Sequence, residues 1–130
     1  MPSIFTKIVK GEIPCHKIAE SEDFLAFLDI NPLAKGHTLV VPKKEIDYLF
    51  DLEDDLLSGI LLFARQVARA LEAAVPCERI GVTVIGLEVP HAHVHLIPIN
   101  GIGDMNFERP KLTISHEELA DLAAQIRKKL

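Results

Sequence analysis

The sequence feature that most constrains the fold is a short alternating run, HAHVHLI, at residues 91–97. Successive side chains of a β-strand point to opposite faces, so a strand here would carry His91, His93 and His95 on one face and apolar residues on the other. The run therefore predicts a half-buried strand. Packing alone is a poor explanation for its polar face, because neighbouring imidazoles repel one another when more than one is charged. We expect this face to be a functional site, since local rules are broken mainly at such sites.

The remainder of the chain predicts one α+β domain over residues 1–130. Further strands are expected at residues 17–20, 23–30, 37–41 and 79–85, with a short helix or turn at 3–10, a long helix at 51–75 and a C-terminal helix at 115–130. The strands do not alternate regularly with helices, which favours a five-stranded, mainly antiparallel sheet. Gly86 lies between the last two strands and is compatible with a hairpin there. Residues 100–113 are predicted to form a loop.

The predicted helix at residues 51–75 has a wide apolar face. Its main stripe consists of Leu56, Ile60, Phe63, Ala64, Val67 and Leu71. Leu57, Leu61 and Ala68 widen this stripe beyond the single face that a surface helix normally buries. Two partners fit such a surface: the C-terminal segment of the same chain, or a second copy of the chain. The width of the stripe does not choose between them.

Charge and apolar content exclude several classes of function. The chain has 14 Lys and Arg against 19 Asp and Glu, a net charge of −5, which argues against the basic stripe that nucleic-acid binding needs. The longest apolar run, residues 60–64, is far shorter than the roughly 20 residues of a membrane span. No secretory signal pattern is visible, and Cys15 and Cys77 do not make a disulfide framework, so we expect a cytoplasmic protein.

Two chemistries suit a row of imidazoles. Neutral imidazole is a common ligand of zinc and copper, so the row could hold a metal together with a ligand from elsewhere in the chain. Alternatively, one imidazole attacks an electrophilic phosphorus while its neighbours orient it and bind the phosphoryl oxygens. No Lys or Arg lies between Gly81 and Asn100, so an anion there would be held by imidazoles and backbone N–H groups. The spacing alone does not decide between the two chemistries.

Three blocks of sequence resemble the histidine triad (HIT) family. They are VPHAHVHLIP at residues 89–98, FLDINP at 27–32 followed by GHTLVVPKK at 36–44, and the N-terminal pattern IFxKI at 4–8 followed by GEIP at 11–14. The blocks stand in the family's order and together cover roughly residues 3–100. The chain is most similar to the Hint branch of nucleotide phosphoramidate hydrolases. The resemblance implies a HIT-like fold, a symmetric homodimer with the sheet continuous across it, and no cofactor.

The resemblance also implies a reaction. His93 matches the family's nucleophile, which attacks the α-phosphorus of a nucleoside 5′-phosphoramidate or related mononucleotide conjugate. Water then hydrolyses the nucleotidyl-histidine. His95 matches the position that binds the transferred phosphate, while His91 and His37 match positions that orient the triad. Two further hypotheses are compatible with the resemblance: a dinucleoside polyphosphate hydrolase on the same scaffold, and a nucleotide-binding regulator with vestigial activity.

Substrate contacts follow from the same resemblance, with a purine nucleotide as the expected partner. Asp29 matches the ribose-binding carboxylate, although an acid capping the turn before Pro32 is an equally good explanation from the residues alone. The base pocket is expected to be lined by Phe5, Ile8, Ile13, Leu28 and Ile30. Glu88 occupies the position of a leaving-group contact in some members.

The chain departs from the family pattern in three places. Ser3 and Thr6 stand where the zinc-binding members carry cysteines, so no structural zinc is expected. The loop before the triad is short, with Ile85 and Leu87 where Hint proteins carry Asn and Gln. Residues 101–130 do not match the Hint C-terminus, which shapes substrate choice in the family. Substrate identity therefore stays open.

Overall fold

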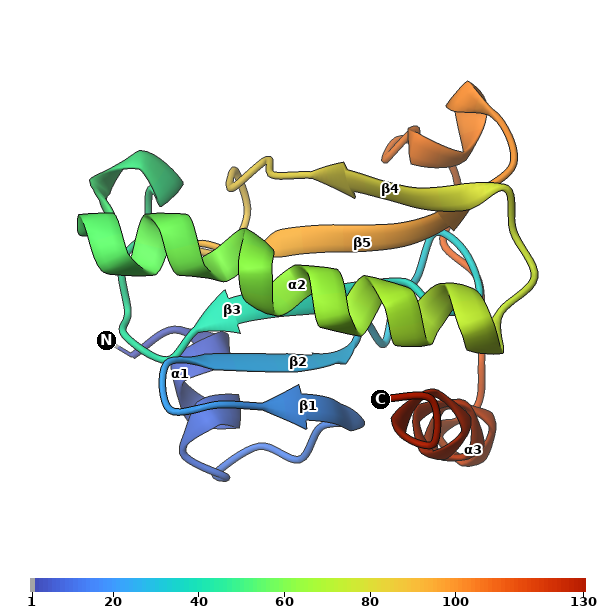
Figure 1. Cartoon of the computed structure of the whole chain (residues 1–130), viewed down its shortest axis with the longest axis horizontal. Helices are drawn as coiled ribbons and strands as arrows, with labels where there is room; N and C mark the ends of the chain where they lie inside the picture. Colours follow the sequence, from blue (N-terminus) through green and yellow to red (C-terminus); the bar gives the residue numbers. More distant parts are fainter. Residues whose placement is uncertain (1) are drawn as a thin grey trace.

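A five-stranded antiparallel sheet forms the centre of the computed structural model, which describes residues 2–130. The strands are β1 (Lys17–Glu20), β2 (Phe24–Leu28), β3 (Thr38–Pro42), β4 (Arg79–Thr83) and β5 (Val94–Ile99), in the spatial order β1-β2-β3-β5-β4 (Figure 1). The helices are α1 (Ile4–Val9), α2 (Asp54–Ala74) and α3 (His116–Arg127), with short 3-10 turns at Leu49–Asp51 and Ile102–Met105. Each neighbouring pair of strands is antiparallel. The predicted α+β class, the five strands and the two main helices are confirmed.

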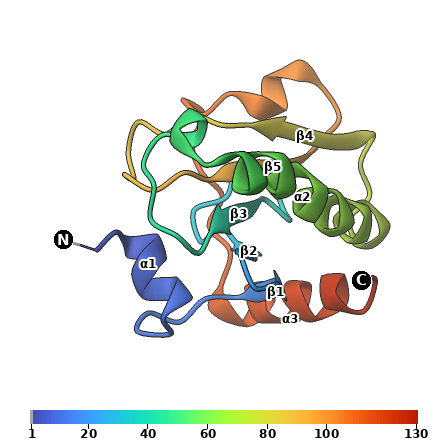
Figure 2. The same ribbon diagram turned by 60° about the vertical axis from the view of Figure 1, so that its left-hand side comes forward.

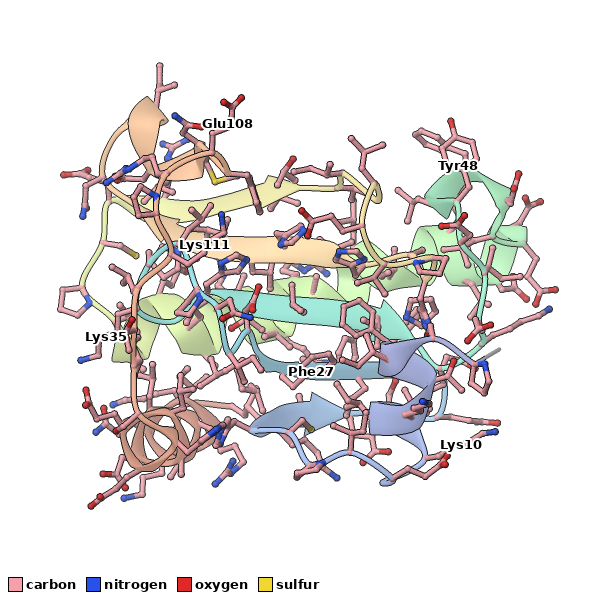
Figure 3. All side chains as sticks on the ribbon, turned by 180° about the vertical axis from the view of Figure 1, so that it is seen from behind. Lys10, Phe27, Lys35, Tyr48, Glu108 and Lys111 are labelled. Carbon is pink, nitrogen blue, oxygen red and sulfur yellow. The ribbon has the colours of Figure 1, made fainter. Side chains whose placement is uncertain are left out.

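The two faces of the sheet are covered by different helices. Alternate residues of the central strands, such as Leu28, Val40 and Leu96, belong to the core beneath α2. The intervening residues, such as Phe27 and Leu39, pack with Phe5 of α1 on the other face. Figures 1 and 3 view the sheet from opposite sides, with α2 in front in one and α1 in front in the other. Burial on both faces explains why β2 reads FLAFL without alternation.

Helix α3 lies beside the β1 edge of the sheet (Figure 2). Its N-cap Ser115 accepts a hydrogen bond from Glu118 N–H, as the capping spacing predicts. Leu119, Leu122, Ala123 and Ile126 complete the core beneath α2. Helix α3 thus accounts for part of the wide apolar face of α2, but Leu61 keeps 57% and Leu62 60% of their surface exposed. None of the helices within residues 2–130 is both long enough and apolar enough to cross a membrane.

Several predicted boundaries differ from the structure, and two of the starts matter for the site or for the helix that covers the sheet. The long helix begins at Asp54 rather than at residue 51, because Leu49–Asp51 forms a separate 3-10 turn. The triad strand begins at Val94, so His91 and His93 precede it. The strand predicted over 91–97 was therefore wrong at its first three residues. There the backbone bends instead, with His91 N–H bonded to Val89 O and Ala92 N–H bonded to Ile46 O.

Candidate active site

Four imidazoles lie together on the sheet face opposite α2. His93 and His95 have ring centroids 4.9 Å apart, and His95 and His37 have centroids 5.2 Å apart. His37 comes from the start of β3, which pairs with β5 through Leu39 and His95. His91 lies beyond His93, and the Phe5 ring contacts both of them edge-on at 5.8 and 4.9 Å. All four histidines are buried. The structure thus brings together the four histidines singled out from the sequence.

The backbone fixes the proton on His93. Its Nδ1 lies 2.8 Å from the carbonyl oxygen of His91. A carbonyl can only accept a hydrogen bond, so Nδ1 carries the hydrogen and the neutral ring keeps its lone pair on Nε2. This contact spans only two residues and depends on the bent backbone at 91–93. The Nε2 of His93 is therefore prepared as a nucleophile or as an acceptor.

In His95 the proton is on the opposite nitrogen, Nε2, and His37 determines this. Leu33 N–H donates to Nδ1 of His37 (3.0 Å), so the hydrogen of His37 is on Nε2. That Nε2–H donates to Nδ1 of His95 (2.9 Å), which leaves the hydrogen of His95 on its own Nε2. Both rings are neutral at pH 7, because burial lowers the pKa of His37 to about 4 and that of His95 to about 3. The site therefore offers a lone pair on His93 and a donor on His95.

His91 has a supporting position. Its Nε2 donates to Pro42 O (2.7 Å), so its Nδ1 is an acceptor and receives the Ser3 hydroxyl (2.8 Å). The ring is completely buried, and burial lowers its pKa. With both nitrogens engaged by the protein, His91 is unavailable to a metal or a substrate.

Asp29 connects the turn after β2 to the histidines. Its Oδ1 accepts Asn31 N–H (2.8 Å), and its Oδ2 lies 3.7 Å from Nε2 of His37. Burial raises the pKa of this carboxyl group. The turn-capping contact expected from the residues is therefore present, while ribose binding by Asp29 stays a prediction.

A metal fits this arrangement poorly. Within residues 2–130, the ligand atoms of one trio, Asp29, His37 and His95, lie within 4.8 Å of one another. A cation bound by Nε2 of His37 and Nδ1 of His95 would displace the proton they share across 2.9 Å. The changed tautomer of His37 would also set its Nδ1–H against Leu33 N–H. The three ligands expected from the alternating run do not form a ligand set, because His91 is already satisfied on both sides.

Comparison with known proteins shows relatives that match this chain in sequence and in fold. The family described as the HIT domain matches residues 10–101. The chain belongs to the HIT family. It is 38% identical to adenosine 5′-monophosphoramidase hnt1 of Schizosaccharomyces pombe, over 100% of this chain and 99% of the relative. A HIT-like protein involved in cell-cycle regulation from Bartonella henselae has a TM-score of 0.86 at 33% identity, covering 98% of this chain and 96% of that one. A zinc-bound histidine triad family protein from Mycobacterium smegmatis has a TM-score of 0.83 at 26% identity, covering 97% and 91%.

Two of the residues expected in the HIT base pocket, Phe5 and Ile8, lie on the histidine face. Phe5 is buried against His93, and Ile8 packs on the same cluster. Ile13 is half-buried, whereas Ile30, next to Asp29, is 55% exposed. Leu28 is a correction: it is 1% exposed and lies in the core beneath α2, because its parity along β2 is opposite to that of Phe27. It cannot line a pocket on the histidine face.

Two site residues come from a segment that was predicted only as a loop. The Phe107 ring packs edge-on to His95 at 4.8 Å and to His37 at 6.0 Å. The Lys111 ammonium lies 5.8 Å from the Phe107 ring centre. Its charge adds to the larger effect of burial in lowering the pKa of His37, and it opposes the rise that burial causes in the pKa of Asp29. Figure 3 shows Lys111 on the face opposite α2. Lys111 supplies a cation that the 81–100 span lacks. An aromatic residue inside a loop rich in Gly and Pro was the one available signal.

Two further carboxylates, Glu88 and Glu45, act on residues of the site. Glu88 is exposed in the loop before His91, and its charge acts on Asp29. Glu45 follows β3 and accepts hydrogen bonds from the backbone N–H of Ser3 and the hydroxyl of Thr6. No pattern in the sequence indicates this contact, since Glu45 lies about 40 residues from either partner.

Proposed function

We propose that this HIT protein hydrolyses nucleoside 5′-phosphoramidates or related mononucleotide conjugates through a covalent intermediate on His93. The observation that carries the proposal is that the neutral rings of His93 and His95 are opposite tautomers, with the proton on Nδ1 of His93 and on Nε2 of His95. In the neutral ring of His93, Nε2 keeps the lone pair, so its attack on the α-phosphorus needs no base. The Nε2–H of His95 is a hydrogen-bond donor for a phosphoryl oxygen, where negative charge grows in the transition state. The bond from phosphorus to the leaving nitrogen breaks as the bond to Nε2 forms, and the leaving amine takes a proton from water. A further water molecule then attacks the phosphorus, the bond to Nε2 breaks, and the nucleoside monophosphate is released.

The surrounding residues support a purine nucleotide as substrate. Asp29 Oδ2 can accept a ribose hydroxyl, since its other oxygen is already committed to the turn. Phe5, Ile8, Ile13 and Ile30 offer apolar contacts for a base on the side of α1. A relative named adenosine 5′-monophosphoramidase that matches the whole chain at 38% identity supports the same substrate class.

Lys111 favours a second candidate, a dinucleoside polyphosphate hydrolase. Its ammonium would attract an anionic leaving group, which a polyphosphate supplies and a simple amine does not. Comparing kcat/KM for adenosine 5′-phosphoramidate with that for diadenosine tetraphosphate separates the two. A higher value for the phosphoramidate supports the main proposal, and a higher value for the tetraphosphate supports the second.

The experiment that tests the covalent step is intact-mass analysis after mixing the protein with adenosine 5′-phosphoramidate. An adenylyl adduct is expected on the unmodified protein and not on His93→Gly. The His16→Ala variant is the matched control, because the His16 ring bonds to His116 (3.2 Å) and not to any of the four histidines of the site. An adduct that persists in His93→Gly would refute the assignment of the nucleophile.

We further propose that the protein is a homodimer with the sheet continuous through β4. This strand is at the edge of the sheet, and Val82 on it is 53% exposed. Beside it, a groove of ≈ 930 Å³ is lined by apolar residues of α2, β4 and the segment before α2, among them Tyr48, Phe50 and Leu61. Sedimentation of Leu61→Glu should show a monomer where the unmodified chain shows a dimer. A dimer that survives this substitution would count against the proposed interface.

A further inference from the structure

One carboxylate oxygen secures the N-terminus of α1. Oε1 of Glu45 accepts the backbone N–H of Ser3 at 2.6 Å and the hydroxyl of Thr6 at 2.6 Å. The backbone hydrogen bond from Ser3 and then the bond from Thr6 lower the pKa of Glu45 to about 2, so the carboxylate is ionised at any physiological pH. Charge-assisted hydrogen bonds of this kind are short and strong. An otherwise exposed acid from the loop after β3 therefore ties down the helix that carries Phe5 and Ile8.

The Ser3 hydroxyl extends this tie to the triad. Its oxygen accepts Thr6 N–H (3.0 Å), which makes Ser3 the N-cap of α1. Its hydrogen is donated to Nδ1 of His91 (2.8 Å), because Nε2 of that ring already donates to Pro42 O. Ser3 is 5% exposed and His91 is fully buried, so water does not compete for these bonds.

His91 passes the constraint on to the nucleophile. Its ring is held at both nitrogens, which fixes the position of its backbone. Its carbonyl oxygen is the atom that accepts Nδ1–H of His93. A ring that loses its Ser3 partner would leave this carbonyl less well placed, and the tautomer of His93 less well defined. Meanwhile the Phe5 ring, carried by α1, packs edge-on against His93 at 4.9 Å.

We propose that Glu45 is a positioning residue for His93, acting through Ser3, Thr6 and His91. The catalytic part of this inference rests on the function proposed above, whereas the orientation of the His93 ring is a property of the folded protein alone. Glu45 works as a hydrogen-bond acceptor, so an amide oxygen at the same place retains most of its effect. A substrate contact by Glu45 is not part of the proposal.

The test compares Glu45→Ala, Glu45→Gln and Glu53→Ala. Glu53 is the matched control, because it is an exposed carboxylate paired only with Lys44 across 3.3 Å. Two-bond ¹H–¹⁵N spectra of the histidine rings report which nitrogen of His93 is protonated. We expect a single Nδ1–H tautomer in the unmodified protein, Glu45→Gln and Glu53→Ala, and a mixture of tautomers in Glu45→Ala. With adenosine 5′-phosphoramidate, kcat of Glu45→Ala should fall by about 10-fold to 100-fold, the loss typical of a misplaced reacting group.

Ser3→Ala separates positioning from simple loss of stability. It keeps the backbone N–H that binds Glu45 but removes the hydroxyl bonded to His91, so it should lower kcat more than it raises KM. The proposal is overturned if Glu45→Ala keeps both the Nδ1–H tautomer and the unmodified kcat, or if folded Glu45→Gln loses as much activity as Glu45→Ala. If no variant and no unmodified protein hydrolyses the nucleotide, the proposed function fails, and the ring spectra still decide the role of Glu45.

Discussion

Replacing Gly36 with alanine should destabilise the fold more than the same change at another glycine of similar conformation. Gly36 has φ +94°, in the region that L-residues avoid. A Cβ there would lie 2.9 Å from Leu71 Cδ1, 3.2 Å from Pro98 Cγ and 3.2 Å from Val75 Cγ2. Two of these side chains come from the end of α2 and one from strand β5, so two elements of the core would have to adjust.

The two costs can be separated. The backbone conformation costs about 1–2 kcal/mol for a residue with a Cβ. Overpacking a filled core adds about 1–3 kcal/mol. The sum for Gly36→Ala is therefore about 2–5 kcal/mol. Gly11 has φ +79° with nothing within 4 Å of the same added atom, so Gly11→Ala should carry the first cost alone.

Urea unfolding followed by circular dichroism at pH 7 measures both variants against the unmodified chain. The free energy of unfolding should fall further for Gly36→Ala than for Gly11→Ala, by the overpacking cost of about 1–3 kcal/mol. Equal losses in the two variants would show that the core around His37 accommodates the methyl group, and the steric reasoning would be wrong.

Three further predictions concern the histidines and their surroundings. The folded pKa values of His37, about 4, and His95, about 3, lie below the unfolded value of about 6.5. The unfolded chain therefore binds more protons in acid than the folded chain does. The contribution of these rings to the free energy of unfolding should be constant above pH 7 and fall between pH 6.5 and 4, by up to about 1.4 kcal/mol per pH unit for each ring. Urea midpoints across this range test it, and a flat profile would contradict it. Phe107→Ala should hydrate His95 and raise its pKa in an NMR titration, whereas Phe107→Leu should keep the His95 pKa low. Identical titrations of Phe107→Ala and the unmodified protein would show that Phe107 does not exclude water from His95. Leu28→Ala should lower the free energy of unfolding by about 2–5 kcal/mol while leaving KM for the nucleotide unchanged, and a raised KM in the folded variant would return Leu28 to the pocket.

The sequence predicts the architecture well because its patterns are local. The capping spacing at Ser115 and the alternation around His95 depend on neighbours in the chain, and both are found. The Leu28 prediction was wrong because a strand buried on both faces loses its alternation, so parity could not be read from FLAFL. Only the pairing of β2 with β3 and the packing of α2 decide which side Leu28 faces.

Contacts between distant segments were beyond sequence reasoning. Phe107 reaches His95 because Leu112 N–H donates to Pro32 O (2.8 Å), a bond that folds residues 106–112 back over the site. Glu45 reaches Ser3 only after α1 has packed against the sheet. Neither contact follows from a periodicity or a spacing, because each requires the relative placement of a loop and an element distant from it in the chain.

The start of β5, rather than the alternation of histidines, gives the imidazoles different chemistry. Within a central strand, backbone carbonyls are committed to the ladder, so a carbonyl is not available to fix the proton of a neighbouring ring. Because β5 begins at Val94, the carbonyl of His91 lies outside the ladder and accepts Nδ1–H of His93. His95 lies inside the strand, and its proton is set by His37, whose own Nδ1 accepts Leu33 N–H from the loop before β3. In a regular strand the His93 and His95 rings would have equivalent surroundings. The bend at residues 91–93 makes His93 a nucleophile and leaves His95 a hydrogen-bond donor.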